Sequence, residues 1–344
     1  LMAKKSITAA DVAKLAGVSQ PTVSRVFSVE TKVSKILELK VKTAAAELGY
    51  RPNRLARTLA TGRSKTIGLI VSFLDNPFYP EALEKLSLVL NESGYHILIF
   101  MAANQAEEID TIVEDLLDNQ VDGIIFASVG ISNSLTDRLV KENIPLVLFN
   151  RGQDDPRLSS VTSANFEGGR TVAQFLLAGG HQRIAHISGW QGSSTGRDRQ
   201  AGFIEELKDA GQELIGCIDS RFRRSLAAEA TRQLFLGEII PDAIFVGNDH
   251  MAFAVMETIR TELGLRIPED VSVVGYDDVS MSEWPSFNLT TIRQPANRMV
   301  EETVKMLLSM IDGDFLTVQK LEIDASLQVR GSARIPEEWP NEEF

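Results

Sequence analysis

The chain has 344 residues, of which 44% are hydrophobic and 24% charged, as in a globular protein of two or three domains. Its single cysteine, Cys217, excludes an internal disulfide, and its four histidines lack the spacing of metal ligands. The basic start has no apolar core after it, and no apolar run reaches the roughly 18 residues of a membrane span. We therefore expect a cytoplasmic protein without a metal, a cofactor or a membrane partner.

The net charge of −12 is unevenly distributed. Residues 1–65 contain thirteen Lys and Arg against four Asp and Glu, whereas the rest of the chain holds 22 basic and 43 acidic residues. A basic segment joined to an acidic body indicates a nucleic-acid-binding head, because Lys and Arg make most phosphate contacts. A solvated basic tail would have the same charge, so the residue pattern must decide between the two.

The basic segment has the pattern of an all-α domain. Thr8 precedes the first predicted helix, and Gly17 ends it in a left-handed conformation. Ser19 can cap the second helix, and Gly49 ends the third. The three helices are expected at residues 9–16, 20–27 and 34–48. Three short helices, the first two joined by a tight glycine turn, predict a helix-turn-helix domain over residues 1–50.

A linker follows at residues 51–65. Asn53 can cap a short helix that Gly62 ends. This segment has few apolar residues, so its helix should be marginal in isolation.

Beyond Lys65, short apolar runs alternate with helical patterns. The predicted strands are residues 66–71, 95–101, 123–127, 145–149, 184–188, 243–246 and 271–275. The predicted helices are residues 78–93, 105–119, 133–143, 165–179, 196–210, 225–237, 250–263 and 296–312. Such alternation indicates an α/β fold with parallel sheets covered on both faces, and its length indicates two lobes. Ligands of such sheets bind beyond the carboxyl ends of strands.

Several motifs, taken in order, resemble those of the lactose/galactose repressor family (LacI/GalR). They are VAKLAGVS at 12–19, TVSRV at 22–26, ELGYRPN at 47–53, GND at 247–249, VGYDD at 274–278 and LTTIRQP at 289–295. The resemblance implies a dimeric transcription regulator whose core is two-lobed and similar to periplasmic binding proteins. In that fold the chain crosses between the lobes three times.

The resemblance also implies domain boundaries. The hinge helix and linker would occupy residues 51–65, and the core residues 66–333. The N-lobe would comprise residues 66–162 and 293–322, and the C-lobe residues 163–290 and 325–333. We expect the crossings near 162–165, 290–293 and 322–326, and an acidic tail at 334–344.

In the head, the second helix is expected to enter the major groove of a near-palindromic operator. Gln20, Pro21 and Arg25 would face base edges, where Gln can pair with adenine and Arg with guanine, each worth about 1–3 kcal/mol of discrimination. The residues better placed for phosphate contacts are Ser19, Thr22 and Ser24. The alternative for each of these side chains is a solvated surface position.

The resemblance places the hinge helix in the minor groove. Leu59 would wedge into a central base step, with Asn53, Arg54 and Arg57 near the backbone. Alternatively, Leu55 and Leu59 pack against the core. Glu38 stands where the family commonly has arginine, so a phosphate contact at that point stays open.

Side chains after strands or at lobe junctions match the family's ligand positions. They are Phe78, Tyr79, Asn150, Thr195, Arg199, Phe222, Asn248, Asp277 and Gln294. Amides, charged groups and aromatic rings suit a polyhydroxyl ligand, so we expect a sugar, sugar acid or sugar phosphate as effector. Additional arginines, such as Arg151 and Arg197, favour the acid or the phosphate. Two alternatives are a nucleobase effector and a purely structural Arg199–Asp277 ion pair.

An enzyme is the competing class of function. Residues 192–196 fit G-x-S-x-G, the motif around the nucleophile of serine hydrolases, with Ser194 at its centre. The preceding strand should end at residue 188, too early for a nucleophile elbow, and nucleotide-binding glycine motifs are missing. We therefore expect a regulator and not an enzyme. The last residues contain prolines and no leucine heptads, which predicts a dimer and not a tetramer.

Overall fold

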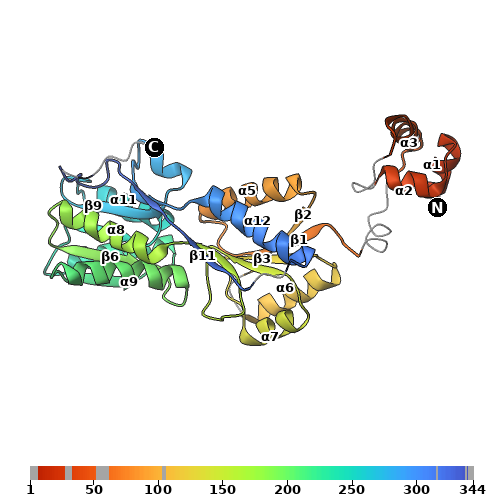
Figure 1. Cartoon of the computed structure of the whole chain (residues 1–344). Coiled ribbons are helices and arrows are strands. Elements are labelled where there is room, and N and C mark those ends of the chain that lie inside the picture. The colour runs from red at the N-terminus through yellow and green to blue at the C-terminus, as the bar shows by residue number, and fades with distance from the viewer. Residues whose placement is uncertain are drawn as a thin grey trace, which may run out of the picture. The chain divides into compact units, whose positions relative to one another are not determined.

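The computed structural model describes residues 7–27, 33–51, 62–102, 106–314, 317–337 and 339. The chain separates into two compact units, Leu1–Ser64 and Lys65–Phe344, and each is described by itself (Figure 1). The predicted hinge helix falls on residues outside the described ranges.

The first unit contains the three predicted helices, α1 (Ala9–Ala16), α2 (Gln20–Val26) and α3 (Lys35–Leu48). Thr8 and Asp11 form a capping box, since the Thr8 side chain accepts from the Asp11 amide and the Asp11 carboxylate accepts from the Thr8 amide at 2.9 Å. Gly17 ends α1 with φ 63°, as expected. Val12, Val23 and Val41 are fully buried and join the three helices in one core.

Ser19 occupies the N-cap of α2, but its side chain does not cap the helix. Its hydroxyl lies 2.9 Å from the Thr22 hydroxyl and binds no helix amide. The expected side-chain cap is therefore wrong, because the two hydroxyls satisfy each other.

The second unit contains two six-stranded sheets. The N-lobe sheet has the order β11-β5-β4-β3-β1-β2, and all its strands are parallel. Its strands are β1 (Thr66–Val71), β2 (His96–Met101), β3 (Gly123–Ala127), β4 (Leu146–Phe149), β5 (Ser160–Ser163) and β11 (Lys320–Ile323). Its helices are α5 (Phe78–Glu92), α6 (Ala106–Asp118), α7 (Asn133–Lys141) and α12 (Ala296–Asp312). Helices α5 and α12 lie side by side on one face, and α6 and α7 cover the other (Figure 1).

The C-lobe sheet has the order β12-β10-β9-β8-β6-β7, in which only β12 is antiparallel to its neighbour. Its strands are β6 (Ile184–Ser188), β7 (Gly216–Asp219), β8 (Ala243–Val246), β9 (Ser272–Asp277), β10 (Thr290–Arg293) and β12 (Ser326–Gln328). Helices α8 (Asn165–Ala178) and α9 (Ser194–Asp209) pack together, as do α10 (Arg224–Leu236) and α11 (Asp249–Thr261). A short 3₁₀ helix spans Ser280–Glu283.

The strands bury side chains on both faces with a period of two. In β8, Ala243 and Phe245 pack with α8 and α9, whereas Ile244 and Val246 pack with α10 and α11. This two-sided burial explains why central strands such as β1, β3, β4 and β8 are apolar throughout, and it confirms the predicted doubly covered parallel sheets.

The chain passes between the two sheets at three places, after Ser163, after Arg293 and between Ile323 and Ser326. Ile323 pairs with Ser163, and Ser326 pairs with Arg293. The three passages therefore lie side by side. This confirms the expected three crossings and joins the lobes by a narrow, three-stranded connection.

The apolar pattern missed five strands, β5, β7, β10, β11 and β12. Strand β5 reads SVTS and is fully buried, yet it contains one apolar residue. Short strands of this kind are held by backbone pairing with neighbours, which an apolar-run criterion does not detect.

Part of the predicted acidic tail also packs on the C-lobe, where the Trp339 ring meets Phe175 edge-on at 5.0 Å. Within the described ranges, no helix is long and apolar enough to cross a membrane.

Close packing of α8 on α9 depends on glycine. A Cβ on Gly202 would lie 2.0 Å from the carbonyl oxygen of Phe166, which is backbone and has little freedom to move. We expect Gly202→Ala to lower the free energy of unfolding by about 1–3 kcal/mol. Gly130→Ala is the control, because a Cβ there meets nothing within 4 Å. Urea denaturation measures both, and an equal stability of the two variants would contradict this packing.

Candidate functional sites

Polar side chains from the carboxyl ends of strands in both sheets enclose a cleft of about 380 Å³, its open mouth included. The lining residues are Phe73, Asp75, Asn76, Tyr79, Ser128, Asn150, Arg151, Thr195, Arg199, Phe222, Asn248 and Asp277. Seven of the nine predicted ligand positions therefore meet here: Tyr79, Asn150, Thr195, Arg199, Phe222, Asn248 and Asp277.

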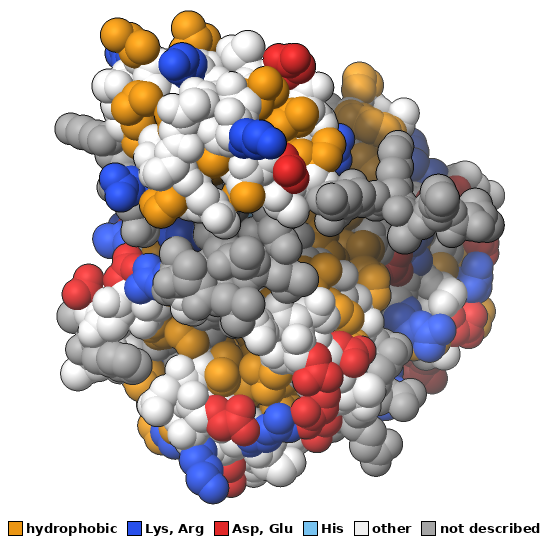
Figure 2. All heavy atoms as spheres, turned by 90° about the vertical axis from the view of Figure 1, so that its right-hand side faces the viewer, with side chains coloured by type: hydrophobic (Ala, Val, Ile, Leu, Met, Phe, Trp, Pro, Cys, Tyr) orange, Lys and Arg blue, Asp and Glu red, His pale blue; other side chains and the backbone are white. Residues whose placement is uncertain are grey.

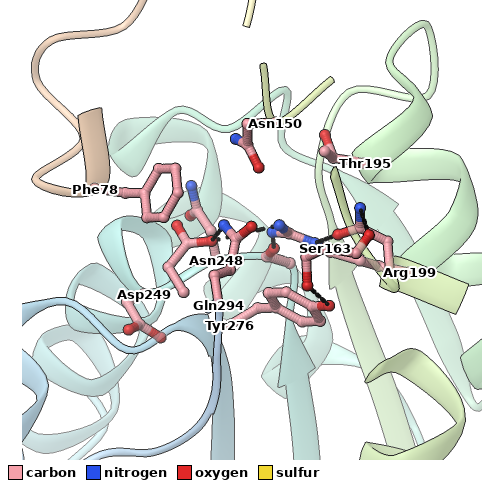
Figure 3. A network of polar contacts seen from close by, with 12 residues as sticks. Phe78, Asn150, Ser163, Thr195, Arg199, Asn248, Asp249, Tyr276 and Gln294 are labelled. Atoms are coloured by element: carbon pink, nitrogen blue, oxygen red, sulfur yellow. Dashed lines mark hydrogen bonds and ion pairs between the residues drawn. The ribbon is translucent and has the colours of Figure 1, made fainter. Parts of the chain in front are cut away.

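Arg199, on α9, is buried on the C-lobe side of the cleft and contacts four other residues there (Figure 3). Its Nε donates to Asn165 Oδ1 at 2.8 Å, and its Nη1 donates to the Gly247 carbonyl at 2.7 Å. The guanidinium lies 3.6 Å from the centre of the Tyr276 ring, and its Nη2 lies 3.4 Å from Asp277 Oδ1. The ion pair weighed as an alternative to ligand binding is thus present, although both residues also line the cleft.

Asp277 joins the two lobes. It ends β9 with φ 123°, a conformation that L-residues rarely adopt. Gln294 donates to its Oδ1 at 2.7 Å, and Asn76, which follows β1 of the N-lobe, donates to its Oδ2 at 3.2 Å. Burial raises the pKa of Asp277, while Arg199 lowers it. Gln294 therefore holds the Asp277 carboxylate through this hydrogen bond and does not itself line the cleft.

Further contacts link the lobes around the cleft. The Gly152 amide donates to Ser194 Oγ at 3.0 Å, and Asp75 lies 3.4 Å from His250 Nε2. The Ser280 amide donates to Glu81 Oε1 at 3.2 Å. Each contact joins an N-lobe residue to a C-lobe residue, so the structure shows the cleft in a closed arrangement.

The N-lobe side of the cleft presents an amide and a phenol. Asn150, with φ 68°, donates from Nδ2 to the Tyr79 hydroxyl at 2.9 Å, and its Oδ1 has no partner among the described residues. Burial raises the pKa of Tyr79, so the phenol stays neutral. On the opposite side, Asn248 caps α11 through Oδ1, which leaves its Nδ2 as the donor for a ligand.

Phe78 lies in the core and not in the cleft. Its ring stacks on Phe149 at 6.4 Å and meets Tyr79 edge-on at 5.4 Å. The prediction missed four lining residues, namely Phe73, Asp75, Asn76 and Ser128, and Arg151, which it named only for its charge, also lines the cleft. These follow β1, β3 and β4, so a systematic reading of all strand ends would have found them.

Asp249 lies beneath the cleft and is fully buried. It accepts hydrogen bonds from the Val279 amide at 3.1 Å, from Ser282 Oγ at 2.8 Å and from Thr291 Oγ1 at 2.6 Å. Burial, followed by the charge of Asp277, nevertheless raises the pKa of Asp249 to about 8. Burial and the nearby charge of Asp277 thus favour protonation of Asp249, whereas its three hydrogen-bond donors favour the carboxylate.

The predicted base-reading face of the head is open to solvent. Gln20, Pro21 and Arg25 are exposed on α2, whereas Val23 of the same helix is buried. Ser19 and Ser24 are exposed and Thr22 is half-buried. Asn53, Arg54, Arg57 and Leu59 lie outside the described residues and stay predictions.

Glu38 forms an ion pair with Lys42, 2.6 Å away on the same face of α3. The hydrogen bond from Lys42 lowers the pKa of Glu38. The acidic residue at this position is thus partly neutralised within its own helix.

The two units define a class: a helix-turn-helix domain in one chain with a two-lobed binding core. Residues 8–53 match bacterial regulatory proteins of the lacI family, and residues 173–333 match the periplasmic binding protein-like domain. The ribose operon repressor of Escherichia coli (strain K12) is 31% identical over 95% of this chain and 99% of its own. The transcriptional regulator CelR of Thermobifida fusca is 34% identical over 93% of this chain and 96% of its own.

Solved structures of lacI-family regulators are also similar to this chain over nearly its whole length. The lac repressor dimer bound to operator and the anti-inducer ONPF has a TM-score of 0.85 at 31% identity, covering 95% of this chain and 99% of that one. A CelR–cellobiose complex has a TM-score of 0.73 at 32% identity, covering 95% and 100%. The chain belongs to the lacI family of bacterial regulatory proteins, as its motifs predicted.

The raised pKa of Asp249 predicts a pH dependence of stability. A carboxyl group with a raised folded-state pKa stabilises the fold at low pH, and this contribution is lost as pH rises from its ordinary pKa of 3.8 to about 8. Asp249→Asn imitates the protonated form. We expect the free energy of unfolding of the parent to fall relative to that of the variant over this range. Parallel pH profiles in denaturant titrations would show that Asp249 does not titrate there.

Proposed function

We propose that this protein is a transcription repressor whose affinity for a near-palindromic operator changes when a small polyhydroxylated molecule binds in the cleft. The observation that carries this proposal is the position of the cleft. It lies between lobes that three adjacent passages of the described chain join covalently, so a ligand there contacts both lobes and alters their relative position. The head supplies the DNA-binding face, and operator binding places the protein in the cytoplasm.

The groups in the cleft support a sugar-like effector. Asn150 Oδ1 can accept from a hydroxyl, and Asn248 and Thr195 can donate to one, while the Phe222 ring can cover a CH face. Among the relatives, CelR has been solved with cellobiose, and a regulator from Alkaliphilus metalliredigens QYMF, 25% identical with a TM-score of 0.71, with D-xylulofuranose.

The proposal excludes catalysis at Ser194. This residue begins α9, and its Oγ accepts from the Gly152 amide, so the hydroxyl contributes to closing the cleft. His250, the residue considered as its general base, pairs instead with Asp75.

A dimer is part of the proposal, and an apolar surface on the N-lobe supports it. Hydrophobic side chains reach the surface between charged ones, as the face in Figure 2 illustrates. Leu88 on α5 is 58% exposed, and Ile99 and Met101 on the adjacent edge strand β2 are each 50% exposed. An apolar side chain row on an uncovered sheet edge is a favourable surface for self-association.

Ile99→Glu should therefore convert the protein to a monomer, because it places a charge in the proposed interface. Multi-angle light scattering at micromolar concentration measures the mass. Val140→Glu is the matched control, since Val140 lies on α7 at the opposite face of the same sheet and is 38% exposed. If the Ile99→Glu protein is still a dimer, the interface does not include Ile99. If the parent protein is a monomer, the dimer proposal is wrong.

Base recognition is tested through Gln20 and Arg25. We expect Gln20→Ala and Arg25→Ala each to lose about 1–3 kcal/mol of operator binding and to relax preference at one symmetric pair of base positions. Ser24→Ala should weaken all sites alike, because a phosphate contact carries no sequence information. Fluorescence anisotropy at fixed salt, on operators with altered positions, separates the two patterns. If both Gln20→Ala and Arg25→Ala weaken every site equally, α2 does not read bases through these residues.

A further inference from the structure

Arg151 is a buried guanidinium that the fold leaves unpaired. It follows β4 at the edge of the cleft and is 4% exposed. Its guanidinium lies over two aromatic rings, 6.0 Å from the centre of Phe73 and 5.6 Å from that of Trp190. Its Nε and Nη1 are buried and have no hydrogen-bond partner in the described part of the chain. Burial lowers the pKa of Arg151, which reflects the cost of keeping this charge in place.

The other charges of the cleft do not balance Arg151. Asp277 is held by Arg199, Gln294 and Asn76, and Arg199 adds a second positive charge nearby. Asp75 has a side chain that is 72% exposed and lies beside His250 at the mouth. Arginine is rarely buried without a partner, because desolvating its charge is unfavourable unless an anion compensates for it. Among the described residues, no carboxylate of the cleft therefore pairs with Arg151.

We propose that the effector carries an anionic oxygen group, a carboxylate or a phosphate, that binds Arg151. This inference rests on the proposed function and narrows its ligand from sugars in general to sugar acids and phosphorylated sugars. Arginine presents a planar fork of donors that matches both groups. Thr195, which also lines the cleft, lies in the first turn of α9, whose N-terminal end carries a partial positive charge. The neighbouring Asn150 Oδ1 remains as an acceptor for a hydroxyl of the same ligand.

One consequence does not require the ligand to be known. If Arg151 binds an anion of the effector, Arg151→Met removes an unpaired buried charge from the ligand-free protein and keeps an apolar stem of similar length at this position. The melting temperature of the ligand-free full-length variant should equal or exceed that of the parent. Arg199→Met should lower it, because it leaves Asn165, Gly247 and Asp277 without their partner. A fall for Arg151→Met as large as that for Arg199→Met would assign Arg151 a structural role and overturn the proposal.

The second experiment compares matched neutral and anionic probes by isothermal titration calorimetry on the full-length protein. The probes are D-glucose, D-gluconate, D-glucose 6-phosphate, D-ribose, D-ribose 5-phosphate and inorganic phosphate. At least one anionic probe should bind more tightly than its neutral counterpart, and Arg151→Met should weaken that probe by about ten- to a hundredfold while leaving the neutral sugars unchanged. Preference for gluconate or for a sugar phosphate identifies which anion the cleft accepts.

Arg197, the other arginine considered from the sequence, does not line the cleft, since it is an exposed guanidinium that pairs with Asp154 at 3.5 Å, and Arg197→Met is therefore the matched control. It should leave the affinity for anions within about twofold, as expected for a solvent-exposed ion pair. Neutral sugars that bind the parent as tightly as the anions would refute the anionic effector and leave the proposed sugar response standing. If no probe of either kind binds, and none of them changes the affinity for the operator, both the anionic effector and the proposed sugar response are wrong.

Discussion

The buried guanidinium of Arg199 is the interaction on which the arrangement of the cleft depends. It binds the start of α8 through Asn165, the end of β8 through Gly247 and the end of β9 through Asp277. This position requires α9 to approach α8 closely, and Gly169 permits it, since a Cβ there would lie 2.2 Å from the Arg199 carbonyl. Packing of two helices thus determines where the charges of the cleft lie.

The contacts continue from Arg199 into the other lobe. Asp277, held by Arg199 and Gln294, accepts from Asn76 of the N-lobe. A ligand entering the cleft must share or replace these polar contacts, so its binding energy and the closure of the lobes are not independent. The three adjacent passages between the sheets are the only described covalent connections across this boundary, which allows the lobes to rotate about them.

Lys65, at the end of the linker, is attached to the N-lobe and must move with it. The Lys65 amide donates to Asp122 Oδ2 at 3.0 Å, and its ammonium lies 4.4 Å from the centre of the Tyr95 ring. The linker therefore leaves the N-lobe from a residue fixed to that lobe. In a dimer, rotation of the lobes would change the separation of the two linkers, and through them the fit of the two heads to DNA.

Much of this organisation could be predicted from the sequence, for physical reasons that differ between its parts. Helix ends such as Gly17 and strands such as residues 184–188 follow from local preferences and burial, so their positions agree closely with the structure. Short polar strands such as β5 did not show in the pattern, because pairing with distant strands stabilises them. The unpaired state of Arg151 was equally invisible, since a partner, or its lack, depends on the packing of segments far apart in the chain.

The resemblance to the lacI family and the strand-end rule together predicted most of the cleft, because the carboxyl ends of parallel strands meet at one edge of a sheet. It did not separate Phe78, which points into the core, from Tyr79, which lines the cleft, although the two are adjacent on α5. At the start of a helix one residue turns the side chain by about 100°, and only the packing of α5 on its sheet decides which of the two reaches the ligand.

The central claim is that cleft and operator site are coupled through the closure of the lobes. The most direct test is the affinity of the full-length protein for an effector, measured by calorimetry with and without saturating operator, beside the operator affinity with and without that effector. The two ratios of dissociation constants must be equal by thermodynamic linkage and, for the claim to hold, must differ from one by about fivefold or more. An effector that binds with the same affinity to the free protein and to the operator complex would contradict the account.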